Sequence, residues 1–192
     1  MIEHIQNAFQ DSIAVKEAFV ARYADEVAAV AKKLVAAFKK GNKVLLFGNG
    51  GSATDASHIA GELVNRFNRD REGLPAIALG CDPSVVTSIS NDYDFQEVFS
   101  RQVRAFGRKG DVAIGLSTSG NSPNVLRAIE SAKTLGMLTI GFTGKDGGKL
   151  APLVDHAFIV PSNNTPRIQE THITLSHVLC ELVEDSLFPP AR

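Results

Sequence analysis

The sequence contains only two cysteines, Cys81 and Cys180, which form neither a CxxC pair nor a disulfide framework, as suits a reducing compartment. Neither sign of charge is in excess, since 20 Lys and Arg oppose 21 Asp and Glu. The composition therefore lacks the excess of basic residues that is typical of nucleic-acid-binding proteins. The apolar runs are far shorter than the roughly 20 residues that span a bilayer. The segment MIEHIQNAFQD lacks a small-residue cleavage site, so we expect no signal peptide and a cytoplasmic protein.

Glycine and proline are absent from residues 1–40. Apolar residues recur there at a helical period, first as Ile2, Ile5, Phe9 and Ile13. The pattern predicts a helical arm that ends at Gly41, with Asp25 able to cap a second helix within it. Because the apolar stripe is too long for one small domain to cover, we expect the arm to be an oligomer interface.

Beyond residue 42 the pattern changes to short apolar runs that alternate with helical segments. Such runs, bounded by turn residues, are typical of parallel strands covered on both faces. The predicted strands are 43–48, 75–80, 112–117, 138–143 and 157–161, and the predicted helices are 52–67, roughly 95–106, 123–135 and 166–187. We therefore predict one α/β domain over residues 1–192, a doubly wound five-stranded parallel sheet with an N-terminal arm. Ligands of such sheets bind beyond the carboxyl ends of the strands.

A glycine turn, Gly48-Asn49-Gly50-Gly51-Ser52, follows the first predicted strand. Glycines let the backbone approach a ligand closely, and the next helix offers free N–H groups to an anion. The turn matches a dinucleotide fingerprint weakly, but the acidic residue expected about 20 positions later is missing. No Lys-Ser/Thr pair follows, so the turn is not a P-loop.

A second polar loop, STSGNSPN at 117–124, follows the third predicted strand. Ser122 and Pro123 suit the N-cap and N1 positions of a helix, so one interpretation makes Ser122 only a cap. The two loops nevertheless converge on one crevice, which favours phosphate binding by hydroxyls and backbone amides. Neither loop contains lysine, so a sugar monophosphate fits better than a polyphosphate with magnesium.

Further polar residues are candidates for the same site. After the second strand, Asn91 and Asp92 could bind sugar hydroxyls, or Asp92 or Asp94 could cap a helix. His58 and Glu62 project from one face of the predicted helix 52–67, as a surface hydrogen bond or as metal ligands. The last helix adds Gln169, Glu170, His172 and His177, residue types that suit zinc or a similar divalent ion.

Five motifs together resemble a known family. GNGGSATDASHIAGEL, SNDYDF, STSGNSPNV, FTGKDGG and RIQETHITLSH are similar, in this order and spacing, to the sugar isomerase (SIS) domain family and within it to the phosphoheptose isomerases. The resemblance implies a flavodoxin-like SIS fold and a homotetramer that shares its active sites between subunits. It also implies conversion of sedoheptulose 7-phosphate to D-glycero-D-manno-heptose 7-phosphate, on the route to bacterial surface polysaccharide.

The resemblance also implies roles for particular residues. The metal ligands, for one zinc ion per subunit, are His58, Glu62, Gln169 and His177. The acid–base pair is Glu62 and His177. The substrate-contacting positions are Asn49, Gly50, Gly51, Ser52, Glu62, Asn91, Asp92, Ser117, Thr118, Ser119, Ser122 and Gln169. An unbroken helix would separate Gln169 from His177 by roughly 12 Å along its axis. Either the helix begins after Gln169, or the two residues reach one metal from different subunits.

The implied chemistry is proton transfer between C1 and C2 through an enediolate, with a metal-assisted hydride shift as the competing mechanism. The alternative to an enzyme is a non-catalytic tetrameric scaffold that resembles the replication initiator-associating protein. That protein lacks the carboxylate corresponding to Glu62, so the presence of Glu62 favours the enzyme.

Overall fold

The computed structural model describes residues 1–189 and contains a parallel sheet of five strands. Its strands are β1 (Val44–Gly48), β2 (Ala76–Ala78), β3 (Val112–Ser117), β4 (Leu138–Gly144) and β5 (His156–Val160). They lie in the order β2-β1-β3-β4-β5 with every neighbouring pair parallel. This order is that of a flavodoxin-like doubly wound sheet and confirms the predicted fold class.

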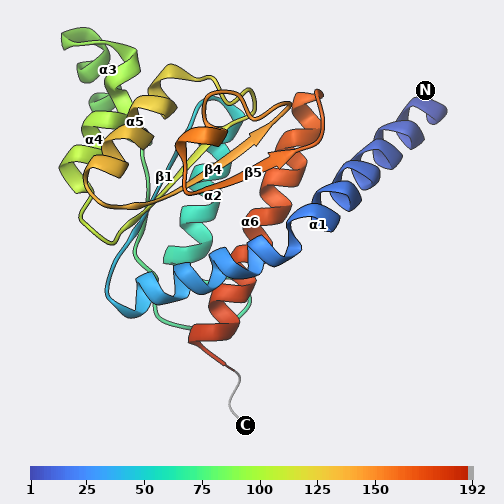
Figure 1. The fold of residues 1–192 in the computed structure, drawn as a ribbon, viewed down its shortest axis with the longest axis horizontal. Helices are drawn as coiled ribbons and strands as arrows, with labels where there is room; N and C mark the ends of the chain where they lie inside the picture. The colour runs from blue at the N-terminus through green and yellow to red at the C-terminus, as the bar shows by residue number, and fades with distance from the viewer. Residues whose placement is uncertain (190–192) are drawn as a thin grey trace.

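Helices cover both faces of the sheet (Figure 1). They are α1 (Ile2–Lys39), α2 (Gly51–Val64), α3 (Pro83–Asp92), α4 (Val98–Phe106), α5 (Pro123–Thr134) and α6 (Thr165–Leu187), with 3-10 turns at η1 (Phe95–Glu97) and η2 (Ala151–Leu153). Successive side chains of a strand point to opposite faces. Leu46 of β1 therefore lies in the core beneath α1, α2 and α6, and Leu45 lies in the core with α4 and α5.

The N-terminal arm is one continuous helix, so the prediction of a second helix capped by Asp25 is wrong. With no glycine or proline inside α1, nothing interrupts its backbone hydrogen bonds, and Asp25 lies at an exposed mid-helix position. Figure 1 shows the first turns extending beyond the body of the molecule. Phe9 is 68% exposed there, whereas from Val15 onward the apolar stripe packs against the domain.

The segment after β2 also differs from its prediction. Residues 83–92 form α3, because the carboxylate of Asp82 accepts hydrogen bonds from the amides of Ser84 and Val85, and Pro83 occupies the first turn. Asn91 and Asp92 therefore end a helix instead of lying in a loop. Asp94 caps η1, accepting from the amide of Gln96 at 2.7 Å. Within residues 1–189 no helix has the length and apolarity needed to cross a membrane.

Candidate active site

The glycine turn joins β1 to α2 in a conformation that needs glycine. Gly50 has φ 56° and is the N-cap residue of α2. A Cβ on Gly48 would lie 2.9 Å from the carbonyl oxygen of Leu116 on the neighbouring strand. The turn therefore packs against β3, and the first amides of α2 point out of the carboxyl edge of the sheet.

The serine loop lies at the same edge, between β3 and α5. Ser122 is the N-cap residue of α5, but its hydroxyl makes no capping hydrogen bond and lies 2.9 Å from the hydroxyl of Ser117. The interpretation of Ser122 as only a helix cap is therefore not supported. Gly120 has φ 64°, and a Cβ there would overlap the carbonyl oxygen of Gly147, so the loop packs tightly against residues 144–148.

An amide pair that the sequence analysis missed holds the two loops together. The side chains of Asn49 and Asn124 exchange two hydrogen bonds of 2.8 and 2.9 Å. Since β1 and β3 are neighbours in the sheet, the predicted convergence of their loops is observed. Asn91 and Asp92 instead hydrogen-bond each other at 2.8 Å at the exposed end of α3.

Three predicted ligands meet between α2 and α6. His58 Nε2 lies 3.0 Å from Glu62 Oε1 and 3.4 Å from His177 Nε2. Ligand atoms of all three residues lie within 4.8 Å of one another. Two imidazoles and one carboxylate suit a borderline divalent ion such as zinc. The side chains of His58 and Glu62 are 47% and 25% exposed. A metal held by His58, Glu62 and His177, the three residues called the metal cluster below, would keep a side open to substrate.

Two residues around the metal cluster were not singled out from the sequence. The ring of Phe67 lies 5.6 Å from the ring of His177, centroid to centroid. Asp55 shares a face of α2 with His58, and its Oδ2 is buried with no hydrogen-bond partner within residues 1–189. Burial raises the pKa of Asp55, and the nearby His58 opposes that rise.

Gln169 lies about two turns nearer the N-terminus of α6 than His177. The helix begins at Thr165, which rules out a helix that starts after Gln169. A Cβ on Gly51 would overlap the side-chain amide nitrogen of Gln169, so this side chain lies against the glycine turn. Within one chain Gln169 therefore borders the glycine turn, and His177 borders His58.

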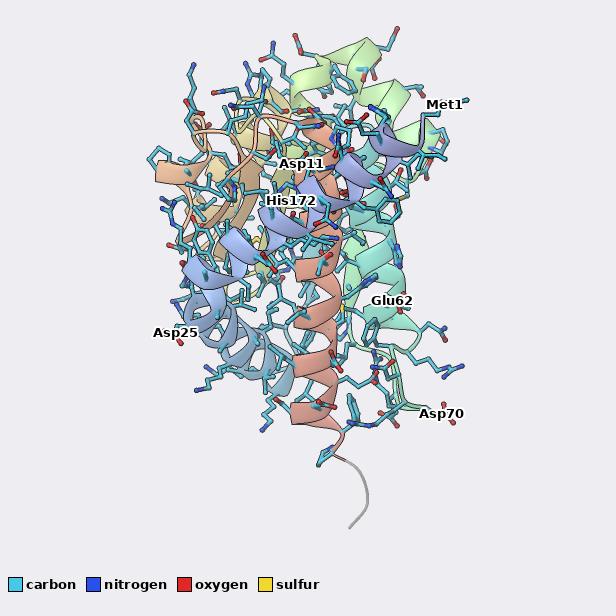
Figure 2. The ribbon with its side chains drawn as sticks, turned by 90° about the vertical axis from the view of Figure 1, so that its right-hand side faces the viewer. Met1, Asp11, Asp25, Glu62, Asp70 and His172 are labelled. Carbon is cyan, nitrogen blue, oxygen red and sulfur yellow. The ribbon has the colours of Figure 1, made fainter. Side chains whose placement is uncertain are left out.

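His172 faces away from the metal cluster. It is fully buried, and Nε2 donates to the carbonyl oxygen of Thr143 at 3.0 Å. Figure 2 labels His172 on the upper part of α6, and Glu62 near the lower end of α2. Burial lowers the pKa of His172 to about 4, and the hydrogen bond to Thr143 opposes the shift. This histidine therefore belongs to the core.

The buried imidazole should make the protein sensitive to acid. In the unfolded chain His172 binds a proton near pH 6.5, whereas the folded chain resists protonation down to about pH 4. The contribution of the neutral His172 to the free energy of unfolding is therefore fully present above pH 6.5. It should fall by up to about 3 kcal/mol as the pH drops to 4. Urea unfolding across this range should show the loss in the wild type and in the exposed-residue control His4→Gln. His172→Gln should be less stable at pH 7 but lack this contribution to the slope; an unchanged slope would contradict the assignment.

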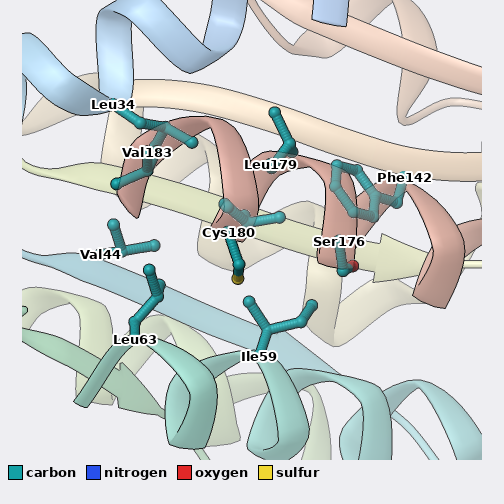
Figure 3. Close-up of a pocket in the computed structure, with 10 residues that line it drawn as sticks. Leu34, Val44, Ile59, Leu63, Phe142, Ser176, Leu179, Cys180 and Val183 are labelled. Atoms are coloured by element: carbon teal, nitrogen blue, oxygen red, sulfur yellow. The ribbon is translucent and has the colours of Figure 1, made fainter. Parts of the chain in front are cut away.

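An apolar layer lies between α2 and α6, the two helices that carry the metal cluster. Figure 3 shows Ile59 and Leu63 of α2 facing Leu179, Cys180 and Val183 of α6. The cavity that these residues line has a volume of about 20 Å³. Such a void is close to the volume that one water requires, so the packing between α2 and α6 is nearly complete. Burial raises the pKa of Cys180 to about 12, so its thiol stays protonated and unreactive.

The SIS domain model matches residues 9–144, so the parallel sheet with two loops at its carboxyl edge belongs to a sugar isomerase (SIS) domain. Phosphoheptose isomerases of Thermodesulfovibrio yellowstonii and Aquifex aeolicus are each 57% identical to the chain; the matches cover 97% and 96% of it, and 92% and 97% of the relatives. The solved phosphoheptose isomerase of Neisseria gonorrhoeae superposes with a TM-score of 0.90 at 41% identity, covering 95% of this chain and 98% of that one. The chain belongs to the phosphoheptose isomerase family. The prediction of an isomerase is confirmed, and the non-catalytic scaffold is not favoured.

Proposed function

We propose that this isomerase converts sedoheptulose 7-phosphate to D-glycero-D-manno-heptose 7-phosphate, in the cytoplasm of a bacterium that makes heptose for its lipopolysaccharide. The observation that carries the proposal is that the chain holds two loops suited to a phosphate and, on α2 and α6, a partly exposed cluster of one carboxylate and two imidazoles. The family membership supports the same substrate class. We further propose that residues 1–192 form a single SIS domain, with residues 1–40 as its oligomerising arm.

The phosphate end of the substrate is assigned to the two loops. Amides at the start of α2 and hydroxyls of the serine loop can donate to phosphate oxygens. The proposed contacts are Asn49, Gly50, Gly51, Ser52, Ser117, Thr118, Ser119 and Ser122, with Asn91, Asp92 and Gln169 toward the sugar.

Removing one hydroxyl from the serine loop should weaken substrate binding more than folding. Ser119→Ala and Ser122→Ala each lose a donor to a charged phosphate, which is worth about 1.5 to 3 kcal/mol, or about 10- to 100-fold in affinity. Titration calorimetry with the sugar phosphate would measure the loss, and thermal unfolding would provide the comparison. Ser88→Ala on the exposed face of α3 is the control. Wild-type affinity in both loop variants would remove the loop from the phosphate site.

The chemical step is assigned to Glu62 and His177. Glu62 would take the carbon-bound proton and return it to the neighbouring carbon, and His177 would move the oxygen-bound proton. Both side chains are partly exposed, which supports access by the sugar. A hydride shift between C1 and C2 is the competing route, and it would require no carbon-bound proton to reach Glu62.

We propose zinc as the metal, held by His58, Glu62 and His177, with Gln169 of a neighbouring subunit as the fourth ligand. The donor set and its 4.8 Å spread support the first three. When bound, zinc would supply Lewis-acid stabilisation to the negative charge that develops on the two sugar oxygens. Gln169 and His177 lie in one helix at different levels, which supports a second subunit as the source of Gln169.

Distance also supports active sites that are shared in a homotetramer. Glu62 lies eleven residues beyond Gly51 on α2, or roughly 16 Å along the helix axis. The phosphate loops and the base of one chain are thus far apart, and a partner can supply the missing half. The exposed apolar residues Ile5 and Phe9 of α1 support burial of the arm between subunits.

One experiment tests the proposed reaction. The purified protein is incubated with sedoheptulose 7-phosphate, and NMR is used to detect the aldose product. We expect the heptose 7-phosphate to form in the presence of zinc and to be lost after chelation. No aldose from the zinc-loaded protein would reject the proposed reaction.

A further inference from the structure

A buried carboxylate on α6 organises the chain segment that follows α2. Glu184 is 2% exposed, and its two oxygens accept hydrogen bonds from three consecutive backbone amides. The amide of Phe67 lies 2.9 Å from Oε2, and the amides of Asn68 and Arg69 each lie 2.8 Å from Oε1. Arg71 Nε donates to Oε2 at 3.1 Å. The segment 65–73 is therefore folded around one carboxylate.

Arg71 in turn closes the C-terminal end of α2. The helix ends at Val64, so its last carbonyls lack helical partners. The guanidinium of Arg71 donates to the carbonyl oxygens of Glu62 at 2.8 Å and Leu63 at 2.7 Å. A cation at this end also complements the helix dipole. The last turn of α2, which carries Glu62, is thus held by a side chain that is itself 2% exposed.

The same segment contacts the metal cluster from its other side. Glu184 binds the backbone of Phe67, and the ring of Phe67 packs against His177 with ring planes inclined by 34°. His177 then faces His58. Two series of residue contacts therefore start at Glu184. One reaches Glu62 through Arg71, and the other reaches His177 through Phe67.

A contribution to folding stability does not by itself explain the buried ion pair of Arg71 and Glu184. Desolvating two charges costs about as much as their attraction returns, so buried ion pairs are often replaceable by apolar residues. Burial opposes ionisation of Glu184, but the amides of Phe67, Asn68 and Arg69 and the Arg71 guanidinium hold the pKa of its carboxyl below the usual value. The pair is therefore charged at neutral pH, and its geometry is fixed by directed hydrogen bonds.

We propose that Arg71 and Glu184 are positioning residues for this isomerase, which set Glu62 and His177 at the separation that metal binding and proton transfer require. The inference rests on the proposed function, because it takes the metal cluster as the reacting centre. Neither residue faces the open side of the cluster, so both act through others. Replacing the residues that orient metal ligands typically changes metal affinity by 10- to 100-fold.

The first test is Glu184→Gln, which keeps the shape of the side chain and turns one acceptor into a donor facing other donors. We expect a folded oligomer whose affinity for Zn²⁺, measured by chelator competition without substrate, falls by about 10-fold or more. The value of kcat should fall, and KM for the sugar phosphate should stay near that of the wild type because the phosphate loops are untouched.

Asp111→Asn is the matched control. Asp111 is also a buried carboxylate, and it accepts hydrogen bonds from the amides of Lys43 and Arg108 and from the Lys43 ammonium group. It lies before β3, at the opposite edge of the sheet from the loops. We expect Asp111→Asn to lower the melting temperature about as much as Glu184→Gln does, and to leave Zn²⁺ affinity and kcat unchanged.

Phe67→Leu keeps the inference testable if Glu184→Gln does not fold. It preserves the amide that binds Glu184 and removes only the ring against His177, so it should weaken Zn²⁺ binding and shift the imidazole NMR signals of His177. Wild-type Zn²⁺ affinity and kcat in both Phe67→Leu and any folded Glu184→Gln protein would overturn the inference. A wild-type protein that binds no Zn²⁺ at the cluster and does not isomerise the sugar phosphate would instead reject the proposed function.

Discussion

Glu62→Gln is expected to give a folded protein that binds sugar phosphate and zinc but turns over about 10²- to 10⁴-fold more slowly. The amide keeps the size of the side chain and one oxygen that can coordinate a metal, yet it cannot accept the carbon-bound proton. Glu130→Gln, on the exposed face of α5, is the control and should keep wild-type turnover. Near wild-type turnover in Glu62→Gln would remove Glu62 from the mechanism.

Solvent exchange separates the two chemical routes. In deuterated water the wild type should place deuterium on the carbon that receives the proton, because a proton held on Glu62 exchanges with solvent. Glu62→Gln should show no such incorporation. Transfer without any solvent deuterium in the wild type would favour the hydride shift and leave the rate of the variant as the only support for a base.

Disruption of the arm should separate the subunits and abolish activity together. Ile5 and Phe9 are 56% and 68% exposed in the single chain and lie on one stripe of α1. Aspartate at both positions would place two charges in the proposed interface, where an unpaired buried charge is prohibitive. Sedimentation of Ile5→Asp/Phe9→Asp should show monomers, and isomerase activity should fall to background because each site lacks its partner residues.

Asn7→Asp provides the control for charge on the arm. Asn7 is exposed on the opposite face of α1, so this variant should keep both the assembly and the activity. A stable wild-type monomer at micromolar concentration would contradict the oligomeric arm. A monomeric double variant with full activity would contradict active sites shared between subunits.

The local patterns that the sequence analysis used correspond to interactions between near neighbours in the chain. The run of residues 43–48, bounded by turn residues, predicted β1 to within one residue of its observed start at Val44, and the spacing of His58 and Glu62 placed them on one helical face. The helix at residues 83–92 was missed although Asp82-Pro83-Ser84 is a local capping signal. The signal for this helix is therefore local and present in the sequence.

Spacing alone could not choose between His172 and His177 as the histidine of the site, and only the family resemblance favoured His177. Five residues apart on a helix, the two side chains point roughly 140° away from each other, so only one can face α2. Which one does so depends on how α6 is rotated against the sheet. Packing decides the matter, since Thr143 and the core receive His172, and His58 meets His177.

The sequence by itself determined the α/β class, the strand-edge loops and the helical pairing of His58 with Glu62, because these follow from periodicity and turn chemistry over a few residues. Only the tertiary structure decided which partners meet across long separations. Glu184 reaches Phe67 and Arg71 from more than a hundred residues away, and Asn49 pairs with Asn124 across two strands. Such contacts leave no periodic signal, because they arise from how whole helices pack on the sheet.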